Sequence, residues 1–222
     1  TGTLTKNEMT VVAAYVDGKE IAITGSGYQP KGAWSLETKS LPQLCAAAAC
    51  CNNAEYSKNS HNQWRMLGDP TEGSLLVAAQ KTSIALKSAQ NQFKRLKEFP
   101  FDSVRKMMST IDYNKKTNQT VVHLKGAPQE VLDRCKYLYE NGKRIPLTEK
   151  KRREILKAND AMANRALRVL ALSERNFGIA APSPESYKKE KVEKDMTLIG
   201  LMGMIDPPRP EVYRAVEMAH TA

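Results

Sequence analysis

The sequence has no long hydrophobic run. Its longest uncharged apolar stretches, residues 44–51 and 196–205, are far shorter than the roughly 20 apolar residues of a membrane-spanning helix. We therefore expect no direct membrane insertion of this chain. With 222 residues, of which 41% are apolar, the chain is long enough for one globular domain with a substantial core, or for one domain and a fragment of another.

Cysteine is also scarce. The four cysteines, Cys45, Cys50, Cys51 and Cys135, show no C-x-x-C spacing and have no histidine close by in the sequence. This pattern argues against a disulfide framework and against a zinc site. We predict buried, reduced thiols, as is typical of a cytosolic compartment.

Positive charge, in contrast, is abundant. The chain has 34 lysines and arginines against 24 acidic residues, for a net charge of +10, and much of the excess lies in residues 143–157 and 188–194. Such charge can attract nucleic acid, an acidic membrane or a nucleotide. No helix-turn-helix, zinc-finger or aromatic RNA-binding signature accompanies it, so solvated helix faces or linkers are the favoured interpretation. A basic nucleic-acid-binding module is the alternative.

Hydrophobic periodicity predicts a mixture of strands and helices. Asp17-Gly18 is typical of a hairpin turn, here between two strand-like runs. The predicted strands are 11–16, 19–24, 93–101, 107–113, 120–125, 168–172 and 196–205, the last fully buried. The predicted helices are 41–51, 70–79, 129–134, 148–165 and 211–220, and residues 176–192 are predicted to be a polar linker.

One strand of this set ends at a cation. Residues 120–124 are apolar or β-branched, and Lys125-Gly126-Ala127-Pro128 follows. We expect Gly126 to adopt a backbone conformation that other residues avoid, and Pro128 suits the first position of a helix. A cation beside a helix N-terminus favours an anion nearby. Taken alone, however, a lysine at a strand end is more typical of a solvated side chain.

Two more segments hold candidate binding residues. In Gly68-Asp69-Pro70-Thr71-Glu72-Gly73, Asp69 is suited to cap a helix and Glu72 to complete a capping box. The predicted hairpin of residues 107–125 brings Phe101, Lys106 and Lys125 into one sheet, so that an aromatic ring and two lysines can converge on one face. Taken singly, Phe101 is more typical of a core residue and Lys106 of a solvated one.

These segments, in this order, resemble the cytosolic catalytic region of P-type cation-transporting ATPases. Thr1-Gly2-Thr3-Leu4-Thr5 is similar to the end of that family's Asp-Lys-Thr-Gly-Thr-Leu-Thr phosphorylation motif, and Asp206-Pro207-Pro208-Arg209 is similar to its return hinge. The matching segments between them are 68–72, 101–108, 125–128 and 167–170. Gly-Asp-Pro-Thr-Glu-Gly and Phe-Asp-Ser-Val-Arg-Lys are closest to the calcium-pump-like branch.

The resemblance implies a fold and a domain division. The expected fold is α+β, an antiparallel β-sheet flanked by helices, with short stubs of an α/β phosphorylation domain. Residues 10–205 would form the nucleotide-binding domain, and residues 1–9 and 206–222 the two stubs. In the whole pump, the partners would be the phosphorylation, actuator and membrane domains of the same polypeptide, at the cytoplasmic face of a membrane.

The resemblance also implies roles for individual residues toward ATP and Mg²⁺. Phe101 would stack on adenine, Glu72 would accept a hydrogen bond from its amine, and Lys125 would close the inner end of the pocket. Lys106 and Arg168 would face the phosphates, Thr1 and Thr3 would belong to the phosphate site, and Thr1 would contact the metal. The neighbouring motif residues expected at the site are Met108, Gly126, Ala127 and Leu170.

This sequence departs from the family's pattern at two positions. Gln129 replaces an acidic residue that many members have after the proline, and Ser103 stands where calcium pumps of the animal muscle type have an arginine. The phosphoryl-accepting aspartate would lie two residues before Thr1, so we expect ATP binding without turnover. The remaining alternatives are a phosphatase of the haloacid dehalogenase type, which would need its paired aspartates, and a non-catalytic interaction domain.

Overall fold

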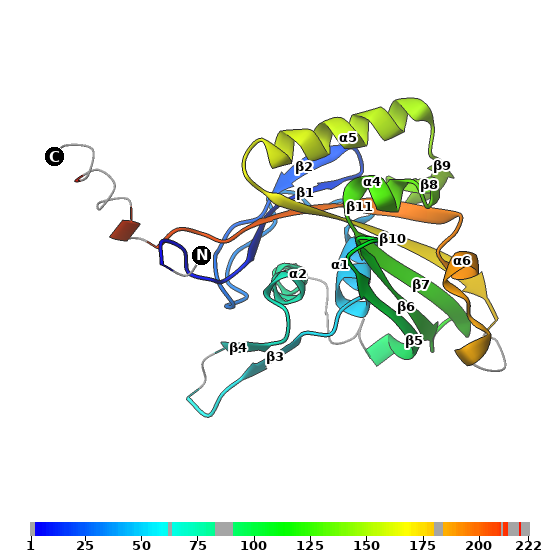
Figure 1. The fold of residues 1–222 in the computed structure, drawn as a ribbon, viewed down its shortest axis with the longest axis horizontal. Coiled ribbons are helices and arrows are strands. Elements are labelled where there is room, and N and C mark those ends of the chain that lie inside the picture. Colours follow the sequence, from blue (N-terminus) through cyan, green and yellow to red (C-terminus); the bar gives the residue numbers. More distant parts are fainter. Residues whose placement is uncertain are drawn as a thin grey trace.

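One large β-sheet organises the chain (Figure 1). The computed structural model describes residues 3–61, 64–82, 91–179, 184–209, 211–212 and 218. Within them, the sheet has the strand order β2-β1-β11-β10-β7-β6-β5, and β8 and β9 extend it beside β11. The strands are β1 (Thr10–Val16), β2 (Lys19–Ala22), β5 (Phe93–Asp102), β6 (Met107–Asn114), β7 (Gln119–Gly126), β8 (Cys135–Glu140), β9 (Lys143–Pro146), β10 (Arg168–Gly178) and β11 (Met196–Ile205).

Nearly all neighbouring strands of the sheet run antiparallel; β8 pairs with β11 in parallel. β6 lies between β5 and β7 and runs opposite to both, so the C-terminal ends of β5 and β7 lie at the same end of the sheet. Since β10 runs antiparallel to β7, its first residues lie at that end too. The topology thus gathers Phe101, Lys125 and Arg168 at one place.

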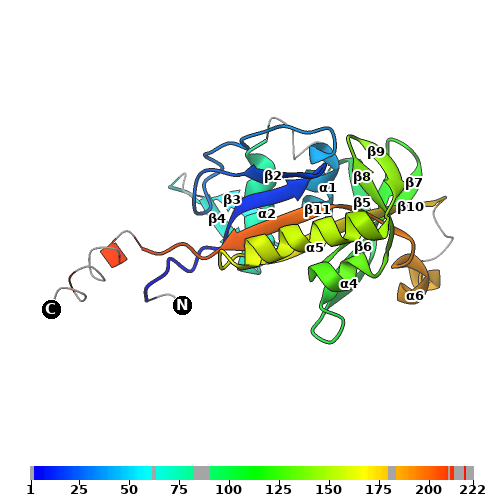
Figure 2. The same cartoon turned by 90° about the horizontal axis from the view of Figure 1, so that it is seen from above.

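Helices cover both faces of the sheet (Figure 2). α1 and α2 pack on one face, whereas α4 and α5 lie on the other, so the expected α+β architecture is confirmed. A separate two-stranded hairpin, β3–β4, stands apart from the main sheet (Figure 1). The helices are α1 (Leu41–Cys50), α2 (Pro70–Gln80), α4 (Pro128–Leu132), α5 (Glu149–Ala163) and α6 (Lys189–Val192), and the hairpin strands are β3 (Glu55–Lys58) and β4 (Trp64–Leu67).

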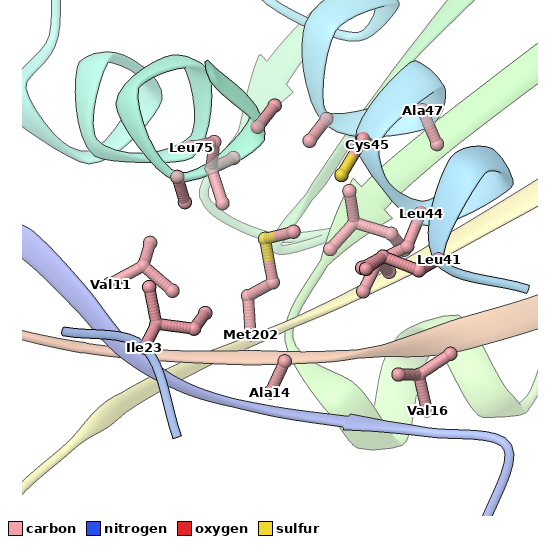
Figure 3. Packing of buried hydrophobic residues seen from close by; sticks show 14 of the residues in the cluster. Val11, Ala14, Val16, Ile23, Leu41, Leu44, Cys45, Ala47, Leu75 and Met202 are labelled. Atoms are coloured by element: carbon pink, nitrogen blue, oxygen red, sulfur yellow. The ribbon is translucent and has the colours of Figure 1, made fainter. Parts of the chain in front are cut away.

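The two core clusters lie on opposite faces of β11. Met202 faces α1 and α2 and packs in a cluster with Leu44 and Leu75 (Figure 3). Its neighbour Leu201 faces the other way, into the cluster that includes Ile155 of α5. Because both faces of β11 are covered, its sequence is an almost continuous apolar run. This confirms the predicted buried strand over 196–205.

The strand and helix predictions agree closely with the structure. Asp17 and Gly18 both have positive φ (54° and 74°), as the tight turn between β1 and β2 requires. The predicted strands 93–101, 107–113 and 120–125 are β5, β6 and β7. Thr148 caps α5 by accepting a hydrogen bond from the Lys151 amide. Most of the predicted helix 211–220 lies outside the described residues.

Other segments were missed or assigned differently. β3, β4, β8 and β9 were not predicted. The predicted linker 176–192 is wrong in part, because β10 extends to Gly178 and α6 forms at Lys189–Val192. The cysteine prediction is confirmed for burial, since all four cysteines are free and buried. Burial raises the pKa of Cys45, Cys51 and Cys135 to about 12.

Candidate functional site

A cavity of about 220 Å³ lies where the ends of β5 and β7, the start of β10 and the N-terminus of α2 meet. Six of the residues expected at the site line it: Glu72, Phe101, Lys125, Gly126, Arg168 and Leu170. Asp69 and Thr71 line it as well and were missed as site residues. Their segment was recognised, but Asp69 was assigned only to capping. The cavity therefore unites residues that are far apart in the sequence.

An ion pair forms the inner wall of this cavity. Lys125 Nζ lies 2.7 Å from Glu72 Oε1, and the two side chains are only 8% and 14% exposed. The other carboxylate oxygen, Oε2, accepts a hydrogen bond of 2.8 Å from the Asn53 amide. A solvated lysine is therefore excluded at position 125. A carboxylate offers about four acceptor positions, so Glu72 can still accept a hydrogen bond from a ligand.

The helix cap of α2 holds Glu72 in this position. Asp69 Oδ1 accepts hydrogen bonds from the amides of Thr71 (2.8 Å) and Glu72 (3.2 Å), and Pro70 occupies the first turn, as the sequence predicts. The expected capping box is wrong, because the Glu72 carboxylate turns to Lys125 and Asn53 instead of the Asp69 amide. The glutamate is thus available to the cavity.

Gly126 has a different role from the one expected. Its φ is not positive, so the predicted special backbone conformation is wrong. A Cβ at this position would lie 2.5 Å from the Lys106 carbonyl oxygen and 2.6 Å from Met107 Cβ. The absence of a side chain lets the Ala127 amide donate a hydrogen bond of 3.0 Å to that carbonyl. Gly126 therefore permits the end of β7 to lie close against Lys106 and Met107 of the neighbouring strand segment.

Phe101 lies at the mouth of the cavity and is 60% exposed, which excludes a core role. It is followed by a turn in which Asp102 Oδ1 accepts hydrogen bonds from the amides of Val104 (2.8 Å) and Arg105 (3.2 Å). These hydrogen bonds lower the pKa of Asp102. The pairing between β5 and β6 is irregular between Phe99 and Asp102, and such irregularities re-aim side chains at sheet edges.

Three of the residues expected around the nucleotide, Lys106, Met108 and Ala127, do not line the cavity. Lys106 has a positive φ of 53°, and its Nζ lies 2.8 Å from Glu130 Oε1, a contact that lowers the pKa of Glu130. Met108 is buried, as the partner of Lys125 across β6 and β7. Ala127 is the N-cap residue of α4. α4 has five residues and begins at Pro128, as predicted.

Arg168 is the cation that remains at the cavity. It is exposed at the start of β10, and it forms no ion pair with any residue that the structure describes. Its guanidinium can therefore bind two oxygens of one phosphate group. Lys106, by comparison, is already paired with Glu130.

The segment that resembles the phosphorylation motif lies beside residues 206–207. Thr5 Oγ1 donates a hydrogen bond of 2.6 Å to Asp206 Oδ2, and the Lys6 amide donates one of 3.0 Å to the Pro207 carbonyl. Thr3 is exposed and does not line the cavity. Thr1, the predicted metal contact, lies outside the described residues.

Comparison with known proteins identifies the family of the chain. Residues 40–211 match the family model described as the cytoplasmic domain N of P-type ATPases. This match covers more than half of the sequence.

The chain belongs to the P-type cation-transporting ATPase family.

Relatives within the P-type ATPases match the whole chain. A calcium-transporting ATPase of Bacillus subtilis is 36% identical over 230 residues, which cover all of this chain and 25% of that protein. A cation-transporting ATPase of Synechocystis is 33% identical, again over all of this chain and 25% of the relative. The calcium-transporting ATPase 1 of Lactococcus lactis is 35% identical over all of this chain and 23% of its own length. The chain thus spans about a quarter of the relatives it matches.

Two further observations bear on the alternatives. Within the described part of the chain, no helix is both long and apolar enough to cross a membrane. Several charges of the basic run 143–157 have partners: Lys151 lies 2.5 Å from Glu140, Arg152 lies 3.0 Å from Asp133, and Arg144 stacks on Tyr137. Such pairing supports a solvated face over a phosphate-binding surface.

Proposed function

We propose that this chain is the ATP-binding domain of a P-type cation-transporting ATPase. The observation that carries the proposal is the cavity itself, where an exposed aromatic ring at the mouth faces a buried Glu72–Lys125 pair. An aromatic ring, a buried acceptor and a buried cation together suit a flat, polar, anionic ligand. Membership of the family supports adenine nucleotide as that ligand.

Each lining residue has a distinct task in this proposal. Phe101 stacks on the adenine ring, and Glu72 accepts a hydrogen bond from the exocyclic amine, which guanine lacks at that position. Lys125 holds the Glu72 carboxylate in place across 2.7 Å. Arg168 binds phosphate oxygens at the cavity mouth. Lys106 joins Arg168 when it exchanges Glu130 for a phosphate.

The residues at the cavity favour binding over phosphoryl transfer. Its two carboxylates are both engaged, Asp69 in capping α2 and Glu72 in holding Lys125. We assign neither of them to phosphoryl transfer. Mg²⁺ would arrive with the nucleotide, where it neutralises phosphate charge. We expect this chain alone to bind ATP without turnover.

In the longer polypeptide, the bound nucleotide presents its terminal phosphate to an aspartate of the phosphorylation domain. Residues 10–205 form the nucleotide-binding domain, and residues 1–9 and 206–222 lead to the phosphorylation domain. The hydrogen bonds of Thr5 and Lys6 to the 206–207 segment support this division. Calcium is the proposed transported ion because the relatives of Bacillus and Lactococcus are named for it.

The exchange Glu72→Gln tests the choice of base. The amide keeps the size of the side chain but loses the charged acceptor, so we expect weaker ATP binding and a smaller preference for ATP over GTP. The amide also cannot satisfy both Lys125 and the Asn53 amide. We therefore expect a stability loss of about 1–3 kcal/mol. The measurement is calorimetric titration of both proteins with ATP and GTP below their melting ranges.

A matched control is Glu55→Gln, which makes the same chemical change at an exposed position of β3 away from the cavity. It should leave the affinities for both nucleotides unchanged. A folded Glu72→Gln protein with an undiminished preference for ATP would remove Glu72 from adenine recognition. A wild-type chain that binds neither nucleotide would overturn the proposed function itself.

A further inference from the structure

We propose that Cys50, Asp112 and His123 form a binding site for a zinc-class divalent metal ion, between α1 and the sheet. The three residues come from three elements: the last residue of α1, the middle of β6 and the middle of β7. Their sulfur, oxygen and nitrogen donor atoms lie within 4.8 Å of one another. This inference does not depend on the proposed ATP site.

The sheet register explains how these side chains meet. Thr110 of β6 pairs with His123 of β7, and Asp112 lies two residues further along β6. Asp112 and His123 therefore project from the same face of the sheet, as Thr110 does. The intervening residues Ile111 and Val122 project into the core cluster on the opposite face. α1 covers the face of Asp112 and His123, and its end brings Cys50 to them.

All three candidate ligands are removed from solvent. Cys50 is 6%, Asp112 2% and His123 0% exposed. His123 Nδ1 lies 2.8 Å from Asp112 Oδ2, whereas His123 Nε2 is buried without a hydrogen-bond partner among the described residues. A buried polar atom without a partner is costly. A metal ion on the imidazole would satisfy the ring, with Asp112 either as a ligand or as the carboxylate that orients it.

The charge balance of the cluster suits a divalent cation. Cys50 binds metal as a thiolate, so its S–H proton leaves to solvent as the metal–sulfur bond forms. Thiolate and Asp112 carboxylate then contribute two negative charges against two positive charges on the ion, and neutral His123 adds none. A buried site with no net charge avoids the large cost of an uncompensated charge.

The surrounding groups fix the position of the Asp112 carboxylate. Thr110 Oγ1 donates a hydrogen bond of 2.7 Å to its Oδ2 atom. Arg95, the positive neighbour of the site, lies 3.8 Å from the other carboxylate oxygen and pairs with Glu98 at 2.9 Å. Its guanidinium also bonds to the Cys50 carbonyl oxygen, which fixes the end of α1 beside the sheet.

The donor set indicates the class of metal. One sulfur, one imidazole nitrogen and one carboxylate oxygen are ligands that Zn²⁺ accepts, with a fourth tetrahedral position for water. Ca²⁺ and Mg²⁺ bind oxygen ligands and are disfavoured by the thiolate. Lys125 lies two residues from His123 on the same face of β7, about 7 Å along the strand. The proposed metal site therefore neighbours the cavity that Glu72 and Lys125 line.

The direct test is titration of the reduced 222-residue chain with Co²⁺, followed by competition with Zn²⁺. We expect one Co²⁺ per chain, a thiolate-to-cobalt charge-transfer band, and displacement by Zn²⁺. Cys50→Ser and His123→Gln should each weaken binding by on the order of 100-fold or more. Cys135→Ser, which alters another buried thiol outside the cluster, should keep the band.

X-ray absorption by the zinc-loaded wild-type chain keeps the proposal testable if a buried variant does not fold. We expect one sulfur ligand at about 2.3 Å and nitrogen or oxygen ligands at about 2.0–2.2 Å. A zinc shell without sulfur overturns the proposal, as does a cobalt band that Cys50→Ser retains or Cys135→Ser loses. Absence of a thiolate band from the wild-type chain also overturns it.

Discussion

Replacement of Lys125 by methionine is expected to destabilise the chain by about 3 kcal/mol and to weaken ATP binding at least about tenfold. Methionine keeps the length of the side chain but removes the cation, so the Glu72 carboxylate stays in the cavity wall without its partner at 2.7 Å. Removal of one member of a buried pair costs about 3–5 kcal/mol. We take the lower end because both side chains keep some exposure, at 8% and 14%.

A double-mutant cycle distinguishes the pair from its separate members. Lys125→Met together with Glu72→Gln leaves no uncompensated charge, so the double variant should be more stable than Lys125→Met alone. ATP affinity should not recover, because the acceptor and the cation are both gone. The measurements are denaturant unfolding and nucleotide titration of all four proteins. Additive stability losses would show that the ion pair does not stabilise the wall of the cavity.

Phe101→Ala is expected to weaken ATP binding strongly and to lower stability little, whereas Lys125→Met lowers both. Aromatic–base stacking contributes about 1–3 kcal/mol, so ATP affinity should fall by about 5- to 150-fold. The ring is 60% exposed, so its removal leaves no core cavity and should shift the melting temperature little. Calorimetric titration and a thermal melt of the same preparation give both quantities.

Val104→Ala is the matched control for Phe101→Ala. Val104 lies three residues after Phe101, in the turn that follows β5, and is 89% exposed, but it does not line the cavity. It should change neither ATP affinity nor stability. If Phe101→Ala lowers the melting temperature without weakening ATP binding, the ring has a structural role and the nucleotide contact must be sought elsewhere.

The strands that bury apolar side chains could be predicted from the sequence because burial leaves a pattern. The run 196–205 is apolar on both faces, and β11 is covered on both faces. β9 was missed because Lys143 and Arg144 dominate its composition. Charged residues are common on edge strands, where they hinder pairing with other chains. Charge therefore conceals an edge strand from periodicity arguments.

The candidate site was predicted as far as the residue types and motifs could indicate it. The pairing of Glu72 with Lys125 could not be predicted, because it depends on the packing of α2 against the end of β7. Lys106 also has a tertiary partner, Glu130, that its own motif does not reveal. Gly126 was recognised as necessary for the wrong reason, since glycine serves positive φ and close approach alike.

The same limit applies to the cluster of Cys50, Asp112 and His123. Sequence spacing argued against a zinc site because no histidine lies near a cysteine along the chain. The fold brings His123 to the end of α1 through the register of β6 and β7. Ligand sets built from different elements cannot be recognised from local spacing.

The most direct test of the central claim is an NMR titration of the wild-type chain with ATP, followed by resonances of Glu72, Phe101, Lys125 and Arg168. We expect saturable shifts at these four residues, with Val104 and the lysines and arginines of α5 unaffected. ATP should move the Phe101 ring resonances most, because a stacked base shields the ring directly. Saturable shifts confined to the basic residues of α5, with the cavity residues unchanged, would contradict the account.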